Sequence, residues 1–140
     1  MFSLHPYLNF NGTTEEAFNF YKSVFGGEFT GFQRFKDIPD GEKMSAEDQE
    51  KIMHVSLPVG NGVVLMGTDA LESMGQKLTA GNNFYISINT ESEEEATELF
   101  NKLSAGGKIE LALEKTFWNA YFGMFADKFG IQWMVNYDYK

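Results

Sequence analysis

An internal repeat is the feature of this sequence that most constrains its fold. Residues 13–17 read TTEEA and residues 92–96 read SEEEA, about 79 positions further along the chain. In both segments a hydroxyl residue stands three positions before a glutamate, which is the pattern of a capping box at a helix start. The two expected boxes pair Thr13 with Glu16 and Ser92 with Glu95. A repeated signal of this kind predicts a chain built from two similar units.

Each box is followed by an amphipathic helix. Apolar residues recur at helical spacing after both boxes, which predicts one buried stripe per helix. The expected stripes are Ala17, Phe20, Tyr21 and Val24 in the first helix, and Ala96, Leu99, Phe100 and Leu103 in the second. Both helices run into paired glycines, which suit the end of a helix.

The remaining apolar segments read as strands, one before each helix and three after it. Residues 5–10 and 83–88 alternate polar and apolar side chains, as strands of a two-faced sheet do. The other expected strands are 28–36, 52–59 and 63–67 in the first unit, and 109–113, 120–126 and 131–137 in the second. The chain therefore predicts two tandem βαβββ units, about 1–68 and about 82–140, within one domain of 140 residues. We expect residues 37–50 to form a surface loop and residues 67–81 to join the units.

This arrangement resembles the vicinal oxygen chelate superfamily, also called the glyoxalase/bleomycin-resistance/dioxygenase superfamily, and most closely its PhnB-like branch. Members of that branch often carry a label mentioning demethylubiquinone methyltransferase. The segments that carry the resemblance are HPYLNF at 5–10, residues 17–27, Met53-His54, KIE at 108–110, TFW at 116–118, DKFG at 127–130 and Trp133-Met134. The resemblance implies an α+β fold in which two units form curved mixed sheets around a concave pocket.

The same resemblance indicates which side chains line the pocket. Alternation along each strand places polar residues on one face and apolar residues on the face that the helices need. The residues expected in the ligand pocket are His5, Tyr7, Asn9, Ser56, Asn83, Tyr85, Trp118, Phe122 and Met134. Trp118 and Phe122 would provide a flat apolar wall, although packing alone would explain them equally well.

Metal-dependent members of the superfamily hold a divalent cation at four strand positions. These correspond here to His5, to Leu65 or Met66, to Asn83 and to Met134. A hard divalent cation prefers several oxygen or imidazole ligands, and His5 is the only good one among these residues. We therefore expect no cofactor, with a metal bound through His5 as the disfavoured alternative.

Few residues are left to carry chemistry. Cysteine is absent, so thiolate catalysis is excluded, and His5 and His54 are the only imidazoles. We name His54 as a candidate general base and Glu110 as a candidate acid or base, because a carboxylate in an aromatic pocket has a raised pKa. The competing interpretation is that both histidines are satisfied by polar neighbours and that Glu110 and Glu114 lie on a solvated strand face.

Composition excludes some partners. The formal charge of -9 disfavours nucleic acid. No apolar run is long enough to span a bilayer, and the first residues lack the pattern of a signal peptide. We expect a cytoplasmic homodimer that binds a small molecule.

Two functional hypotheses remain open. In the first, the protein binds a small, partly aromatic or polar molecule without metal chemistry. In the second, it is a small-molecule enzyme of the lyase, isomerase or dioxygenase type that uses His54 or a glutamate as base.

Overall fold

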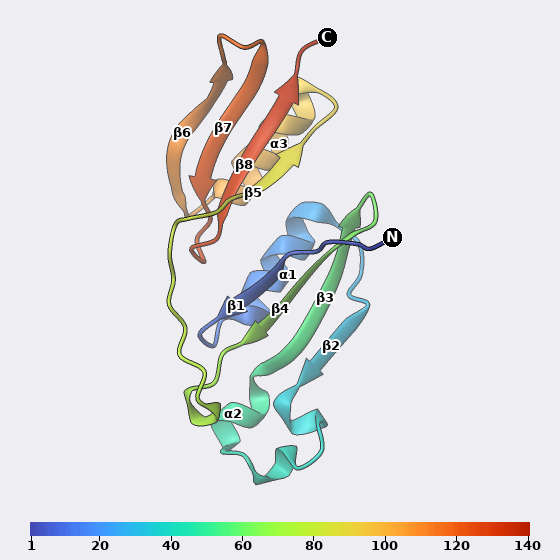
Figure 1. Ribbon diagram of the computed structural model, residues 1–140, viewed down its shortest axis with the longest axis vertical. Helices are drawn as coiled ribbons and strands as arrows, with labels where there is room; N and C mark the ends of the chain where they lie inside the picture. Colours follow the sequence, from blue (N-terminus) through green and yellow to red (C-terminus); the bar gives the residue numbers. More distant parts are fainter. The chain divides into compact units, whose positions relative to one another are not determined.

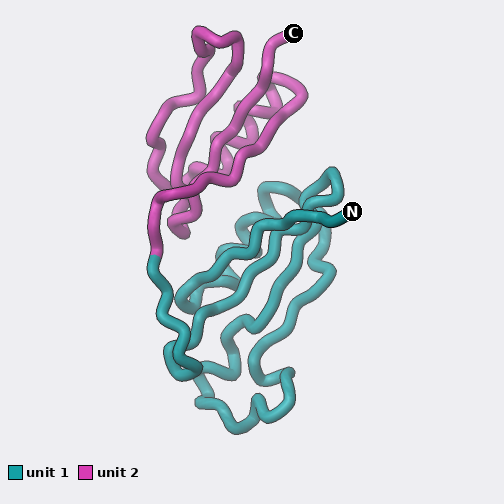
Figure 2. Tube along the Cα trace, in the orientation of Figure 1, with its two compact units in different colours: residues 1–79 teal, residues 80–140 magenta.

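The structure is a computed structural model that describes residues 1–140. The chain divides into two compact units, residues 1–79 and residues 80–140 (Figure 2). We describe each unit by itself.

The first unit is a four-stranded sheet with one long helix against it (Figure 1). Its elements are β1 (Tyr7–Phe10), α1 (Thr14–Phe25), β2 (Gly31–Arg34), β3 (Ile52–Gly60) and β4 (Val63–Asp69). The strand order is β1-β4-β3-β2, in which β1 runs parallel to β4 and the other pairs are antiparallel. The crossover through α1 carries the chain to the opposite edge of the sheet, where β2 begins in the direction of β1. Two antiparallel pairings, β2 with β3 and β3 with β4, then leave β4 beside β1 and parallel to it.

The second unit repeats this plan. Its elements are β5 (Ile86–Asn89), α3 (Glu93–Ser104), β6 (Lys108–Lys115), β7 (Ala120–Ala126) and β8 (Gln132–Asp138). The strand order is β5-β8-β7-β6, again with one parallel pair, between β5 and β8. The predicted α+β fold of two tandem βαβββ units is confirmed.

Several strand ends differ from the sequence-based prediction. The strand expected over 5–10 is β1 and begins only at Tyr7, and the strand expected over 83–88 is β5 and begins only at Ile86. The strand expected over 28–36 is β2 and begins only at Gly31. Pro6 has no N–H to donate, and its carbonyl instead accepts a bond from the Met66 N–H just before β1 begins.

The segment predicted as a loop over 37–50 contains regular structure. Two short 3-10 turns, η1 (Phe35–Asp37) and η2 (Gly41–Lys43), are followed by α2 (Ala46–Glu50). The side chain of Ser45 accepts a hydrogen bond from the Asp48 N–H, which starts α2. The segment joining the units also contains a 3-10 turn, η3 (Glu72–Met74).

The capping box predicted at Thr13 is wrong. Thr13 makes no side-chain cap bond, and Asp69 at the end of β4 takes its place. One Asp69 oxygen, Oδ1, accepts from the Gly12 N–H at 3.0 Å, from the Thr14 N–H at 3.1 Å and from the Thr14 hydroxyl at 2.6 Å. In α3 the Ser92 side chain does accept from the Glu95 N–H, but the Glu95 carboxylate accepts from the Glu91 N–H rather than from that of Ser92. Only half of the second box therefore forms.

Both helices bury an aromatic ring over a glycine of the sheet. A Cβ added to Gly67 of β4 would lie 2.5 Å from Cε1 of Phe18, and one added to Gly123 of β7 would lie 2.6 Å from Cε2 of Phe100. Phe18 is fully buried, whereas the predicted stripe placed Phe20 on the buried side. The residues that α1 buries are Thr14, Ala17, Phe18 and Tyr21, and those that α3 buries are Ala96, Phe100, Leu103 and Ser104.

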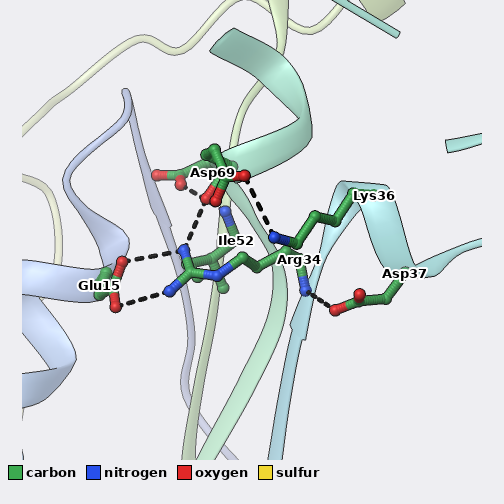
Figure 3. Close-up of polar contacts among 7 residues, drawn as sticks. Glu15, Arg34, Lys36, Asp37, Ile52 and Asp69 are labelled. Carbon is green, nitrogen blue, oxygen red and sulfur yellow. Dashed lines mark hydrogen bonds and ion pairs between the residues drawn. The ribbon is translucent and has the colours of Figure 1, made fainter. Parts of the chain in front are cut away.

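An ion pair links α1 to β2 in the first unit (Figure 3). The Arg34 guanidinium donates to both carboxylate oxygens of Glu15, at 3.0 Å and 2.8 Å, and also to the Glu50 carbonyl at 2.7 Å. Asp37 accepts from the Arg34 backbone N–H. Asp69 accepts from the Ile52 N–H with Oδ2, at 2.8 Å, beside this cluster. Charged side chains thus join the start of α1 to β2 and to the start of β3.

None of the helices combines the length and the apolar character that a membrane crossing requires.

Candidate functional site

Each sheet has one face covered by its helix and a second, helix-free face. In unit 1, Leu8, Val55 and Leu65 are buried on the α1 side. Their neighbours along the strands point the other way, because successive side chains alternate. The helix-free face of unit 1 therefore carries Tyr7, Asn9, Gln33, His54, Ser56, Val64, Met66 and Thr68.

Tyr7 and His54 meet on this face. The Tyr7 hydroxyl lies 3.1 Å from Nδ1 of His54, and the two ring centroids are 5.8 Å apart. β1 and β3 both pair with β4, so the contact spans the strand between them. Burial raises the pKa of Tyr7 above its ordinary value of 10.0, and the phenol is neutral near pH 7.

The second nitrogen of His54, Nε2, makes no hydrogen bond within the protein, and no buried side-chain nitrogen or oxygen lacks a partner. Nε2 is therefore accessible. When Tyr7 donates to Nδ1, Nε2 carries the proton and is a donor. When Nδ1 donates to Tyr7, Nε2 holds a lone pair and is an acceptor or base.

Ser56 lies beside this pair, together with two residues that the sequence analysis missed. The Ser56 hydroxyl is 2.9 Å from the Thr30 hydroxyl. A Cβ added to Gly31 would lie 2.9 Å from Oγ of Ser56 and 3.6 Å from Cδ2 of His54. The absence of a side chain at Gly31 thus leaves room next to both polar groups. A glycine inside an expected strand marks such a close approach, and that signal was present in the sequence.

His5 is engaged separately from His54. Its Nδ1 accepts the Val64 N–H at 3.0 Å, and its Nε2 lies 3.0 Å from the Ser3 hydroxyl. Because Nδ1 accepts from an N–H group, the neutral ring carries its proton on Nε2. No hydrogen bond or ring contact joins His5 to His54.

In unit 2, Tyr85 and Glu110 are brought together at one end of the sheet. The segment before β5 passes the ends of the neighbouring strands before it joins the sheet edge (Figure 1). On the way, the Tyr85 hydroxyl donates to the Glu110 carboxylate of β6, and the Phe84 carbonyl accepts from the Gln132 side chain of β8. The hydrogen bond to Glu110 raises the pKa of Tyr85. Glu110 therefore holds the entering segment in place. Asn83 lies exposed in the same segment.

The helix-free face of unit 2 carries an aromatic group near the β6–β7 turn. Phe122 points away from α3, because its neighbour Gly123 contacts Phe100 of that helix. Trp118 lies in the turn and is 53% exposed, with its ring centroid 5.9 Å from that of Phe122. Met134 of β8 pairs with Met124 of β7 and lies on this helix-free face as well.

A family model described as 3-demethylubiquinone-9 3-methyltransferase matches residues 3–136. The chain belongs to this family.

Three relatives of this family member are similar over nearly their whole length. Protein YjdN of Escherichia coli (strain K12) is 33% identical, over 95% of this chain and 93% of that protein. The solved structure of protein PA1353 from Pseudomonas aeruginosa is 39% identical with a TM-score of 0.86, and covers 99% of this chain and 98% of that one. A putative 3-demethylubiquinone-9 3-methyltransferase, PhnB protein, from Bacillus cereus is 26% identical with a TM-score of 0.78, over 97% and 99% of the two chains. The resemblance to the PhnB-like branch is confirmed.

The fold extends to the wider superfamily. A glyoxalase/bleomycin resistance protein/dioxygenase family enzyme from Burkholderia phytofirmans PsJN matches with a TM-score of 0.63 at 17% identity, over 96% of this chain and 97% of that one. This likeness shows the shared fold alone.

The side chains that the resemblance assigns to the superfamily's metal positions are mostly poor ligands for a hard divalent cation. Leu65 is buried on the helix side, so Met66 is the residue of β4 that reaches the helix-free face. Met66 and Met134 offer soft thioether sulfur, and Nδ1 of His5 is occupied by a backbone N–H. No group of three or more His, Asp or Glu side chains is placed to hold a metal ion.

Proposed function

We propose that this PhnB-like family member binds a small, partly aromatic or polar molecule on its helix-free faces, without a metal ion. The observation that carries the proposal is the Tyr7–His54 pair, in which the imidazole is oriented through Nδ1 and presents Nε2. A histidine fixed by one nitrogen offers the other to a ligand in a defined direction.

The surroundings of the pair support a neutral polar ligand group. The hydroxyl of Ser56 and the space at Gly31 lie beside the imidazole, and the helix-free face of unit 1 carries no Asp, Glu, Lys or Arg among its strand residues. A carbonyl or hydroxyl group would match such donors and acceptors without the cost of burying a charge. Met66 and Val64 supply apolar contact on the same face.

Enzymatic use of the same residues is the second candidate function. In the tautomer in which Nδ1 donates to Tyr7, Nε2 of His54 is a free base, and the phenol oxygen stabilises the imidazolium that forms when it takes a proton. Glu110 is the weaker candidate, because its carboxylate already accepts the bond that holds Tyr85. The reaction would then be a proton abstraction from a bound small molecule.

Methyl transfer from a nucleotide-like cofactor finds less support in this chain. Such cofactors are commonly bound where a glycine-rich turn leads from a strand into a helix, and any phosphate group they carry is bound by free N–H groups at the helix start. In α1 the Gly12 and Thr14 N–H groups are already bonded to Asp69, and in α3 the Glu95 N–H is bonded to Ser92. The family description therefore does not by itself supply a cofactor site here.

The test is a nitrogen-detected NMR titration of the histidine rings. Monocyclic phenols, aromatic carboxylates and a water-soluble benzoquinone are added one class at a time to protein labelled with ¹⁵N at histidine. We expect at least one class to move the Nε2 resonance of His54 and to leave that of His5 in place. Tyr7→Phe should weaken this response, and His5→Gln is the matched control that should retain it.

The proposal is contradicted by a specific combination of ligand and metal-ion results. If no probe class moves His54, while Mn²⁺, Ni²⁺ or Zn²⁺ raises the melting temperature of the wild-type protein and not of His5→Ala, the metal-free proposal is wrong.

A further inference from the structure

The β6–β7 turn places aromatic rings and a carboxylate on one face of unit 2. Glu114 of β6 is the cross-strand partner of Phe122 of β7. Residues directly opposite each other in an antiparallel pair project to the same face, with Cβ atoms about 5 Å apart. Trp118, in the turn, packs against Phe122. Together, Trp118, Phe122 and Glu114 form what we call the acidic aromatic corner.

The rings of this corner stand at steep angles. The planes of Trp118 and Phe122 make an angle of 62°, and those of Phe117 and Trp118 make an angle of 88°. Phe117 is exposed at 97% and Trp118 at 53%. Such rings are expensive to leave in water, and their π faces attract a cation placed between them. The arrangement provides two walls for a compact ligand rather than a flat stacking surface.

A second carboxylate adjoins the corner, and no protein cation neutralises it. Asp138 of β8 is the cross-strand partner of Ala120, so it lies on the same face as Phe122, with one hydrogen bond from the Asn136 side chain. No ion pair reaches Glu114 or Asp138. Lys115, the neighbour of Glu114 in sequence, projects to the helix side, where its Nζ lies 5.0 Å from the ring centroid of Tyr139. Lys140, two residues after Asp138, forms no ion pair with it.

We propose that the acidic aromatic corner binds a small organic cation, a substituted ammonium group. This inference rests on the proposed function and names the class of ligand that the second unit takes. An alkylated ammonium is weakly hydrated, so aromatic faces replace its water at low cost, and the two carboxylates balance its charge. A bare metal ion would need several oxygen ligands instead, which the rings do not provide. The formal charge of -9 on the whole chain also attracts cations.

The experiment compares choline with its neutral isostere 3,3-dimethyl-1-butanol. The protein has two indole N–H groups: that of Trp118, and that of Trp133, which is buried and donates to Asp127 at 2.8 Å. Each gives its own signal in a ¹H–¹⁵N spectrum. We expect choline to move the Trp118 signal with saturation and the isostere to move it at least about threefold less at equal concentration. The Trp133 signal should stay in place and report that the fold is intact.

Two charge variants at the corner and one control variant complete the test. Glu114→Gln should weaken choline binding by about threefold or more and leave the response to the isostere unchanged. The matched control is Glu94→Gln, which removes a charge from exposed α3 and should leave the choline affinity unchanged. Asp138→Asn provides a second variant at the corner with the same expected direction as Glu114→Gln.

The inference is overturned if both probes move Trp118 equally, if neither moves it, or if Glu114→Gln and Asp138→Asn bind choline as the wild type does. These outcomes leave the proposed function standing, because it is read at His54 with aromatic probes that carry no cationic group. If instead no probe moves His54, the choline experiment at Trp118 is still interpretable by itself.

Discussion

Asp69, the last residue of β4, supplies the hydrogen-bond acceptor at which α1 begins at Thr14. Its Oδ1 lies 2.6 Å from the Thr14 hydroxyl and 3.1 Å from the Thr14 N–H. Both residues are buried, at 2% and 0% exposure. A carboxylate at a helix N-terminus satisfies free N–H groups and interacts favourably with the helix dipole. Strand and helix therefore depend on one side chain that is far from the helix in sequence.

Removing this acceptor should destabilise the first unit strongly. Asp69→Ala leaves the Gly12, Thr14 and Ile52 N–H groups without their partner, and we expect the free energy of unfolding to fall by about 3 kcal/mol. Thr13→Ala is the matched control, since Thr13 makes no cap bond. This variant should change the free energy of unfolding by less than about 0.5 kcal/mol. Urea denaturation measures both. Equal effects of the two variants would contradict the assignment.

The Tyr7–His54 bond predicts a specific change in the imidazole. Tyr7→Phe keeps the ring and removes the hydroxyl, so the Nδ1 resonance of His54 should move while both His5 resonances stay in place. Because the bond is exposed, we expect the free energy of unfolding to change by less than about 1 kcal/mol. An unchanged His54 spectrum in the variant would contradict the contact.

The raised pKa of Tyr7 gives this pair a pH signature. Burial favours the neutral phenol in the folded protein, so this contribution to stability is complete below pH 10.0 and is lost as the pH rises beyond it. Wild type should lose more stability than Tyr7→Phe between pH 9 and pH 11. Denaturation curves at these two pH values measure the difference, and parallel losses would count against partial burial of the Tyr7 hydroxyl.

The glycines beneath the helix aromatics should tolerate no side chain. In Gly67→Ala the new Cβ would meet Phe18, and in Gly123→Ala it would meet Phe100, so we expect each to cost about 1–3 kcal/mol of stability. Gly81→Ala is the matched control, because no atom lies within 4 Å of a Cβ there. Combining Gly67→Ala with Phe18→Leu should cost less than the sum of the single variants, as thermal unfolding would show. Simple additivity would mean that the ring is not in contact with the glycine.

The Arg34–Glu15 pair predicts that the difference in stability between wild type and an Arg34 variant depends on pH. The hydrogen bonds from Arg34 hold the pKa of Glu15 below its usual value of 4.5. The pair therefore stabilises the fold above pH 4.5, and its contribution is lost as the pH falls through the lowered pKa. Arg34→Met should be less stable than wild type by up to about 1 kcal/mol at pH 7, and this gap should narrow by pH 3. A gap independent of pH would indicate lost packing of the Arg34 side chain rather than a lost ion pair.

Lys102→Met provides a comparison for this ion pair. Lys102 and Glu98 are more exposed than Arg34 and Glu15 and share a single contact on one helix, at 2.6 Å. Solvent screening weakens exposed pairs, so the effect of Lys102→Met should be the smaller of the two.

Local patterns determined much of this protein. Alternation and helical spacing established both βαβββ units, and motifs such as HPYLNF and DKFG pointed to the PhnB-like branch. These signals act within a few residues, so one chain is enough to read them. The same alternation put Tyr7, His54 and Ser56 on one sheet face. It could not choose between Leu65 and Met66, because that choice depends on the register between β1 and β4.

Contacts between distant segments were decided only by the tertiary structure. Thr13 looks like a helix cap in sequence, yet Asp69 does the capping, because the end of β4 arrives beside α1. Phe18 replaces Phe20 in the core since Gly67 opens a space beneath it. Likewise, His5 bonds to Val64 and His54 bonds to Tyr7, and no local sequence pattern predicts either pair. A sequence records which groups can bond, but the free energy of packing the whole sheet against its helix selects which of them meet.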